Sequence, residues 1–200
     1  MSEKLKTWAL VILTLGFTAG VATADEITVN YTGDNVIFGG LCTDASCTES
    51  VLFPHGPNRL NWRKSDTVTL DLDAGTHWLL FHNFNIGGPS AGNNPAAVLA
   101  EILGGHGGPN YSSSSWEYTT DFVTWYSAAE YGNNGGTNIW TNVNRGPVAG
   151  ISSNANWIWT GGNESAAYFR TSVSVPEPGT LALLGLGLAG VGFARRKANR

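Results

Sequence analysis

The stretch TVTLDLDAGTHWLLFHNFNI, residues 67–86, decides the fold class. Apolar and polar side chains alternate over 67–72, which predicts a half-buried strand with Val68, Leu70 and Leu72 on one face. Residues 73–75 form a turn. Apolar side chains then fall on both faces of 76–86, as expected of a strand in the middle of a sandwich. Two such strands indicate an all-β domain.

Shorter strand-like segments lie on both sides of this stretch. Residues 27–32 and 35–40 are predicted to pair as a hairpin, with Gly33 and Asp34 as the turn. Residues 96–103 permit a short helix by propensity but lie among strand-like segments, so we predict a strand. The remaining predicted strands, separated by Gly- and Asn-rich loops, surround Trp116, Trp125, Trp140, Trp157 and Phe169. No helix longer than two turns is required.

Composition agrees with a single β-rich domain. The chain has 200 residues, of which 42% are hydrophobic and 13% charged, with 26 Gly and 8 Trp. This mixture is too aromatic for disorder and too rich in turn residues for a helical bundle. Both ends have the character of targeting segments, 1–24 and 175–200, which leaves 25–174 for one folded domain.

Charge is distributed unevenly along the chain. The formal net charge is -4, but six of the eleven basic residues lie in the two ends. The body between them has five basic and thirteen acidic residues, a net charge of -8. Such a surface repels phosphate backbones, so we expect no nucleic-acid partner.

The two cysteines, Cys42 and Cys47, belong to the exported part of the chain. In an oxidising compartment they are expected to form a disulfide that pins a surface turn. A metal site is the alternative. It needs two more ligands, and no neighbouring Cys or His supplies them, so the disulfide is favoured.

The N-terminus has the three parts of a secretion signal. Lys4 and Lys6 precede an apolar run over 8–17, and small residues follow. Ala22 and Ala24 offer the side chains that signal peptidase accepts, and we predict cleavage after Ala24. An uncleaved N-terminal anchor is the alternative.

The C-terminus contains VPEPGT, a short apolar segment and a basic cluster, in that order. This order resembles the PEP-CTERM sorting tail of Gram-negative bacteria, with Pro176, Glu177 and Pro178 as the motif and Arg195, Arg196 and Lys197 as the terminal cations. Independently of the resemblance, residues 180–194 would be about 22 Å long as a helix, against a hydrocarbon core of about 30 Å. We therefore expect a marginal transmembrane helix with its basic end in the cytoplasm.

The resemblance implies that an exosortase, an integral membrane enzyme of bacteria that make exopolysaccharide, recognises the tail. The motif residues are then substrate and have no catalytic role. A rigid stalk beside a permanent anchor is the alternative, and it needs neither Glu177 nor so short a helix. The expected location is the inner membrane first, then the cell surface or extracellular matrix after processing.

The order of segments in the body also resembles the galactose-binding-domain-like jelly roll. The resemblance is carried by GDNVIF, TVTLDLDAGTHWLLFHNFN, NPAAVLAEI, SSSSWEY, TWYSAAEYG, ANWIW and YFRTSV. Residues 42–61 depart from the pattern where a second hairpin is expected. The resemblance implies a single antiparallel two-sheet sandwich, jelly-roll-like, and the strand count agrees with it.

Catalytic and metal chemistry have little support in the body. His77 and His82 lie five apart, so on one strand they project to opposite faces, and His55 and His106 have no neighbouring ligand. No nucleophile motif is present. Short loops seldom build the facing carboxyl pair that glycoside hydrolysis requires. We expect no metal, cofactor or catalytic residue, and we interpret the carboxylates as solvated: Glu101, Glu117, Asp121 and Glu130.

Tryptophans beside Asn- and Asp-rich loops give the best hint of function, because indole rings stack on the C–H faces of sugars. The candidate ligand-binding residues are Trp62, Trp116, Trp125 and Trp140, together with Asp34 and Asn35 at the first turn. Core packing and turn formation are the alternatives for each of them. We predict a non-enzymatic surface protein that binds carbohydrate or other envelope components. A small polysaccharide hydrolase and a purely structural matrix protein are the rivals.

Overall fold

The computed structural model describes residues 25–54, 56–88, 90 and 94–177, and residues 185, 187, 188, 190 and 196 of the tail. The chain divides into two units, Ala24–Pro176 and the ends Met1–Thr23 and Glu177–Arg200. Several predicted residues lie outside the described residues: Ala22, Ala24, His55, Pro178, Arg195 and Lys197. Most of the predicted transmembrane segment, 180–194, also lies outside them.

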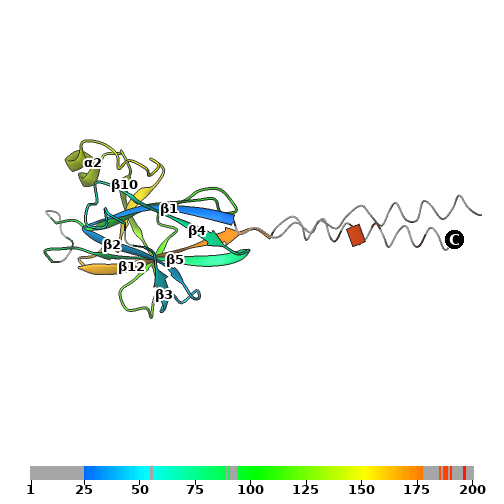
Figure 1. The fold of residues 1–200 in the computed structure, drawn as a ribbon. Helices are drawn as coiled ribbons and strands as arrows, with labels where there is room; N and C mark the ends of the chain where they lie inside the picture. The colour runs from blue at the N-terminus through cyan, green and yellow to red at the C-terminus, as the bar shows by residue number, and fades with distance from the viewer. Residues whose placement is uncertain are drawn as a thin grey trace, which may run out of the picture. The chain divides into compact units, whose positions relative to one another are not determined.

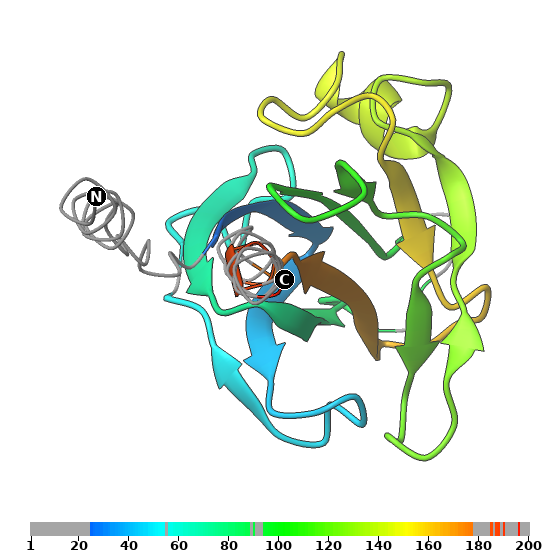
Figure 2. The same cartoon turned by 90° about the vertical axis from the view of Figure 1, so that its right-hand side faces the viewer.

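The unit Ala24–Pro176 is a sandwich of two antiparallel sheets (Figures 1 and 2). Sheet 1 has the order β10 (Ala129–Asn133), β11 (Asn156–Trp159), β6 (Ala97–Leu103), β1 (Asp25–Asp34) and β4 (Asp66–Leu72), and β7 (Asn110–Tyr111) also pairs with β6. Sheet 2 has the order β3 (Ser50–Leu52), β2 (Val36–Cys42), β5 (Gly75–Phe84), β12 (Ala166–Val175), β8 (Glu117–Thr119) and β9 (Tyr126–Ser127). The predicted all-β, two-sheet architecture is confirmed.

The stretch that indicated the fold class behaves as predicted. On β4, Val68 and Leu70 are partly buried and Leu72 is buried, whereas the residues between them are exposed. On β5, Leu79 and Phe81 face the core of the sandwich. The short connection at 73–75 crosses from sheet 1 to sheet 2, because β4 and β5 belong to different sheets.

The predicted hairpin at the start of the domain is wrong. β1 continues through Gly33 and Asp34, which pair with Val98 and Ala97 of β6. β2 then enters the other sheet and pairs with β3 and β5. Gly33 is required for close approach: a Cβ built there would lie 2.2 Å from the Oδ1 of Asn83. The Gly-Asp pair that suggested a turn therefore belongs to a strand.

The segment around Trp140, predicted as a strand, is a helix, α2 (Ile139–Asn144), near β10 in Figure 1. The Asn138 side chain caps it by accepting a hydrogen bond from the Thr141 N–H at 2.8 Å. Arg145 ends it in the left-handed conformation. A single turn suffices to place Trp140 against the first sheet, with 3% of its surface exposed.

Two hydrophobic clusters lie on opposite faces of sheet 1. The main core lies between the sheets and includes Trp116, Trp159 and Phe169. A second cluster lies under α2 and its flanking loops, where the Trp140 and Trp157 rings stack with centroids 4.8 Å apart. β6 is buried on both faces, which confirms the strand predicted at 96–103 and explains why its residues other than Glu101 are all apolar.

Candidate functional site

A row of large side chains lies on the outward face of β5. Leu79 and Phe81 point into the sandwich and are fully buried, so the alternation of the strand turns Trp78, His82 and Phe84 to the outer face of sheet 2. Inward aliphatic and aromatic groups fix the register, because a slip of one residue would expose them. The outer row is therefore held in place by the core beneath it.

The neighbouring strands bring more aromatic rings to the same level. Phe38 of β2 and Tyr168 of β12 both pair with His82, one from each side. The imidazole lies nearly flat on the Tyr168 ring, with centroids 3.8 Å apart and planes at 19°. The ring centroid of Phe84 lies 3.9 Å from that of His82, and the ring centroid of Phe122 lies 4.3 Å from that of Tyr168. Three strands and one loop thus assemble a continuous aromatic surface.

This surface forms the floor of an open depression of about 440 Å³, which we call the aromatic hollow. Its volume is within the range of small-molecule sites. Among the described residues that line it there is no Asp, Glu, Lys or Arg. It consists of Phe38, Cys47, Thr48, Ser50, Leu52, Leu80, His82, Phe84, Phe122 and Tyr168. The chemistry available is apolar ring contact with a few hydroxyl and imidazole groups beside it.

His82 is neutral at pH 7. Burial lowers the pKa of its imidazole from 6.5 to about 4, because the aromatic rings around it replace water that would solvate the charged form. A neutral imidazole has one donor and one acceptor nitrogen. The hollow therefore offers hydrogen bonding without net charge.

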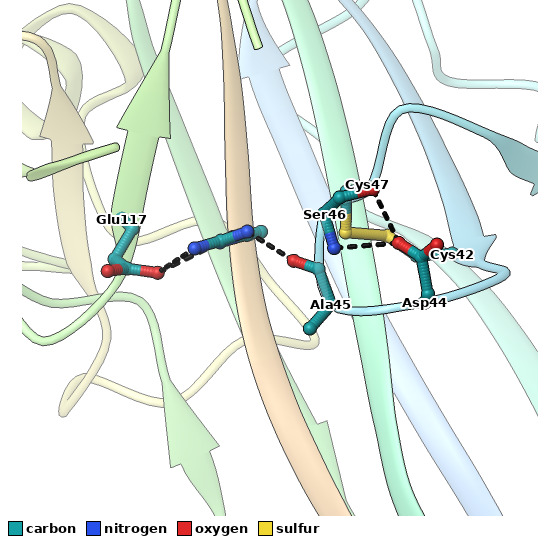
Figure 3. Close-up of polar contacts among 7 residues, drawn as sticks. Cys42, Asp44, Ala45, Ser46, Cys47 and Glu117 are labelled. Atoms are coloured by element: carbon teal, nitrogen blue, oxygen red, sulfur yellow. Dashed lines mark hydrogen bonds and ion pairs between the residues drawn. A yellow bond between two sulfur atoms is a disulfide. The ribbon is translucent and has the colours of Figure 1, made fainter. Parts of the chain in front are cut away.

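Figure 3 shows the loop that the disulfide between Cys42 and Cys47 closes. Cys47 belongs to the lining of the hollow, so this loop forms one of its walls. The predicted disulfide is confirmed. Inside the loop, the Asp44 carboxylate accepts a hydrogen bond from the Ser46 N–H at 2.7 Å. The hydroxyl and backbone N–H of Ser46 lower the pKa of Asp44, since both bonds favour its charged form.

Arg170 of β12 fastens this loop to the sheet. Its Nη1 donates to the Ala45 carbonyl, and its Nε and Nη2 lie 2.8 Å from the Glu117 carboxylate (Figure 3). The guanidinium also lies 3.8 Å from the Trp125 ring centroid and 4.9 Å from that of Trp78. These contacts of Arg170 fix the position of the disulfide loop, and with it one wall of the hollow, relative to sheet 2.

Only some of the candidate tryptophans reach the surface. Trp116 is fully buried, and the centroid of its ring lies 5.3 Å from that of Phe81, so core packing, the alternative to a ligand-binding role, accounts for this residue. Trp140, which belongs to α2, is buried as well. Trp62 and Trp125 are partly exposed but belong to different places: Trp62 packs on the second cluster, and Trp125 packs on Arg170 beside the hollow.

The structure brings Asp34 together with Trp140, but in the interior. The Trp140 Nε1–H donates to the Asp34 carboxylate at 2.9 Å, and Asn35 donates to its other oxygen. Burial raises the pKa of Asp34 to about 6, and the two hydrogen bonds offset part of that rise. Asn35 itself accepts from the Ile86 N–H at 2.7 Å. These contacts engage both oxygens of the buried Asp34 carboxylate, whereas Asn35 is partly exposed.

The histidines and carboxylates considered for metal binding or catalysis are scattered. His77 and His82 pair with Val173 and Tyr168 on β12, an odd number of residues apart, so they point to opposite faces as predicted. Within the described ranges, no three His, Cys, Asp or Glu side chains gather as metal ligands. Glu101 is buried and accepts from the Ser152 N–H at 2.8 Å, Glu117 is paired with Arg170, and Glu130 accepts from the Ser114 N–H at 2.6 Å.

The sequence signal for the hollow was present but divided among four segments. Trp78, His82 and Phe84 recur with period two on the face of β5 opposite Leu79 and Phe81. Phe38 and Tyr168 come from strands whose pairing partners no periodicity reveals. Phe122 comes from a loop. Sequence reasoning therefore found Trp125 at the rim and missed the floor.

The tail begins where the last strand ends. β12 stops at Val175, and Pro176 and Glu177 follow as exposed residues. The family model for the PEP-CTERM protein-sorting motif matches this part of the sequence. Residues 174–197 are a PEP-CTERM protein-sorting motif. No curated protein and no solved structure matches the chain.

The PEP-CTERM motif indicates an exported protein that is held at the membrane and processed by an exosortase-type system. Pro176 and Glu177 of the motif are described, and both are accessible. Among the residues that the structure describes, no helix is long and apolar enough to span a bilayer.

Proposed function

We propose that the sandwich of this PEP-CTERM protein binds carbohydrate in the aromatic hollow and has no catalytic activity. The observation that supports this most is the alignment of Phe38, His82 and Tyr168 across three paired strands, which builds a rigid ring-lined floor on an outer face. The tryptophans proposed from sequence do not form this floor. Trp125 and Trp78 contact the guanidinium of Arg170, which lies beside the floor.

The composition of the hollow suits a sugar ring. The C–H faces of a pyranose pack on aromatic rings, and its hydroxyls need a few polar partners at the edge. Thr48, Ser50, His82 and Tyr168 provide such partners in the lining. Binding requires little loss of conformational entropy from the protein, because the floor belongs to paired strands and the loop that forms the wall is closed by a disulfide.

The proposal of a non-enzyme rests on the same lining. Hydrolysis of a glycosidic bond needs two carboxyl groups across the bond, and the lining residues that the structure describes include none. The sulfur atom of Cys47, a lining residue, is bonded to that of Cys42 and is therefore not a free thiol. A binding role in the envelope or extracellular matrix is what this chemistry favours.

The test is a glycan array on the purified domain, residues 25–176, followed by calorimetry with any polysaccharide that binds. Replacing Tyr168 by Ala is expected to weaken binding about tenfold, the size of effect typical of a central aromatic contact. Tyr131→Ala is the matched control, because Tyr131 is an exposed tyrosine on sheet 1. Circular dichroism shows whether both variants are folded.

Three outcomes separate the candidate functions. Binding that Tyr168→Ala weakens and Tyr131→Ala preserves supports the proposal. Absence of binding to every glycan favours a purely structural matrix protein. Release of reducing sugar by the wild-type domain, abolished by replacing Glu117 or Glu101 with Gln, establishes the hydrolase instead.

A further inference from the structure

β12 is locked in place up to its last residue. Ser174 pairs with Thr76 and Val175 with Gly75 on β5. On the other side, the His106 N–H donates to the Ser174 carbonyl at 2.7 Å, and the Asn110 side chain donates to the Ser172 carbonyl at 3.1 Å. The end of the strand is therefore bonded along both edges.

The sorting motif overlaps this locked end. The matched segment starts at residue 174, so its first two residues belong to β12, and Pro176 follows without a spacer. The side chains of Val173 and Val175 are 5% exposed and belong to the main core. Over residues 174–177, the continuous part of the motif that the structure describes, no spacer separates the motif from β12.

Enzymes that process a peptide chain commonly bind it in an extended form through its backbone N–H and C=O groups. At Ser174 the carbonyl is already taken by His106, and the strand is paired with Thr76. A site that reads residues on the N-terminal side of Pro176 cannot reach them while this pairing persists.

We propose that the folded domain gates its own sorting: the last residues of β12 must separate from β5 and from the loop at His106 before the exosortase can process the tail. The proposal rests on exosortase sorting and is independent of carbohydrate binding. Fraying at the end of a strand costs far less than global unfolding, so such a gate opens without loss of the sandwich. The buried Val175 side chain sets most of the resistance, because it must leave the core.

The test measures the rate of tail processing of the full chain in the native host by pulse labelling and mass. A Gly-Ser-Gly-Ser spacer between Val175 and Pro176 places the motif beyond the locked strand. Processing is expected to become about threefold faster, since the fraying step is bypassed. The same insertion between Gly87 and Gly88 is the control, because these glycines follow the opposite end of β5.

A second variant closes the gate. Thr76→Cys with Ser174→Cys places two thiols on directly paired residues whose hydroxyl oxygens lie 3.4 Å apart. Oxidation of the two thiols forms a cross-link that is expected to slow processing about tenfold, and a dithiol reductant is expected to restore the rate. Each single cysteine variant should behave as the wild type.

The outcomes distinguish the gate from the sorting itself. An unchanged rate with the spacer, or equal acceleration by the control insertion, overturns the gate while leaving sorting in place. A cross-linked variant processed at the wild-type rate overturns it as well. Absence of processing in every form, including the wild type, contradicts exosortase sorting and removes the basis of the proposal.

Discussion

Replacing Asp34 by Asn is expected to change how the stability of the domain depends on pH. The Asp34 side chain is buried beside Trp140, and its pKa rises from 3.8 to about 6 in the folded state. Two pKa units correspond to about 3 kcal/mol of folding free energy. Asn keeps the shape and one acceptor oxygen for the indole N–H but does not ionise.

The sign follows from proton binding. Between pH 4 and 6 the folded state holds a proton on Asp34 that the unfolded state has released. Stability is therefore greatest below about pH 4 and falls as the pH rises through about 6, where the buried carboxyl becomes charged. Above that range the cost of the charge is constant.

His82 acts in the opposite direction and must be removed from the comparison. Its pKa is lowered to about 4, so its contribution to stability is lost as the pH falls from 6.5 to 4. The two trends offset each other in the wild-type curve. The quantity to measure is the free energy of unfolding of Asp34→Asn minus that of the wild type, from urea denaturation at several pH values, because His82 cancels in it.

This difference should increase by about 3 kcal/mol in favour of the Asn variant between pH 4 and 6.5. Its absolute value at pH 4 also contains the loss of the Asn35 contact. A difference that is flat across the range, or that decreases with pH, would refute the argument that burial dominates the ionisation of Asp34.

Three further predictions concern stability. Replacing Cys42 and Cys47 together by Ser should lower the free energy of unfolding by about 2 kcal/mol, the loop-closure value for so short a loop, as measured by urea denaturation. Arg170→Met should lower the free energy of unfolding by about 2 to 3 kcal/mol and change tryptophan fluorescence, because it removes the contacts of the guanidinium with the disulfide loop and with two indole rings. Glu117→Gln should lower the free energy of unfolding by less than about 1 kcal/mol, because the Glu117 side chain is 40% exposed. Trp116→Ala should cost about 4 kcal/mol in calorimetric unfolding, since it empties a fully buried indole site.

Sequence patterns predicted the features that depend on local alternation or close spacing. The strands at 67–72 and 76–86, the buried strand at 96–103 and the short disulfide follow from such signals. The sequence patterns failed where pairing between strands that are distant in the sequence determines the local structure. Gly33 and Asp34 have the composition of a turn, yet β6 holds both in a strand, and the partner that does so lies more than sixty residues away.

The tryptophans show the same limit for the candidate site. Indoles beside polar loop residues suggest a ligand-binding role as well as core packing, but Trp116 fills the main core and Trp140 is buried on the short helix α2. Burial of a large ring is set by the sheet that covers it, which neighbouring residues do not reveal. The aromatic hollow required the registers of β2, β5 and β12 at once, and only the row on β5 was visible in the sequence.

β12 also determines how the domain bears mechanical load. The strand runs from Ala166, near Tyr168 of the hollow, to Val175 at the start of the tail. If the hollow binds a ligand as proposed, His82 of β5 belongs to the site, and a pull on that ligand against the tail draws β5 and β12 apart along the strand axis. The hydrogen bonds to β5 then resist in shear, sharing the force across ten residue pairs rather than unzipping in turn. Resistance to such a pull depends on the rate of unfolding, and bonds loaded in shear favour a slow rate.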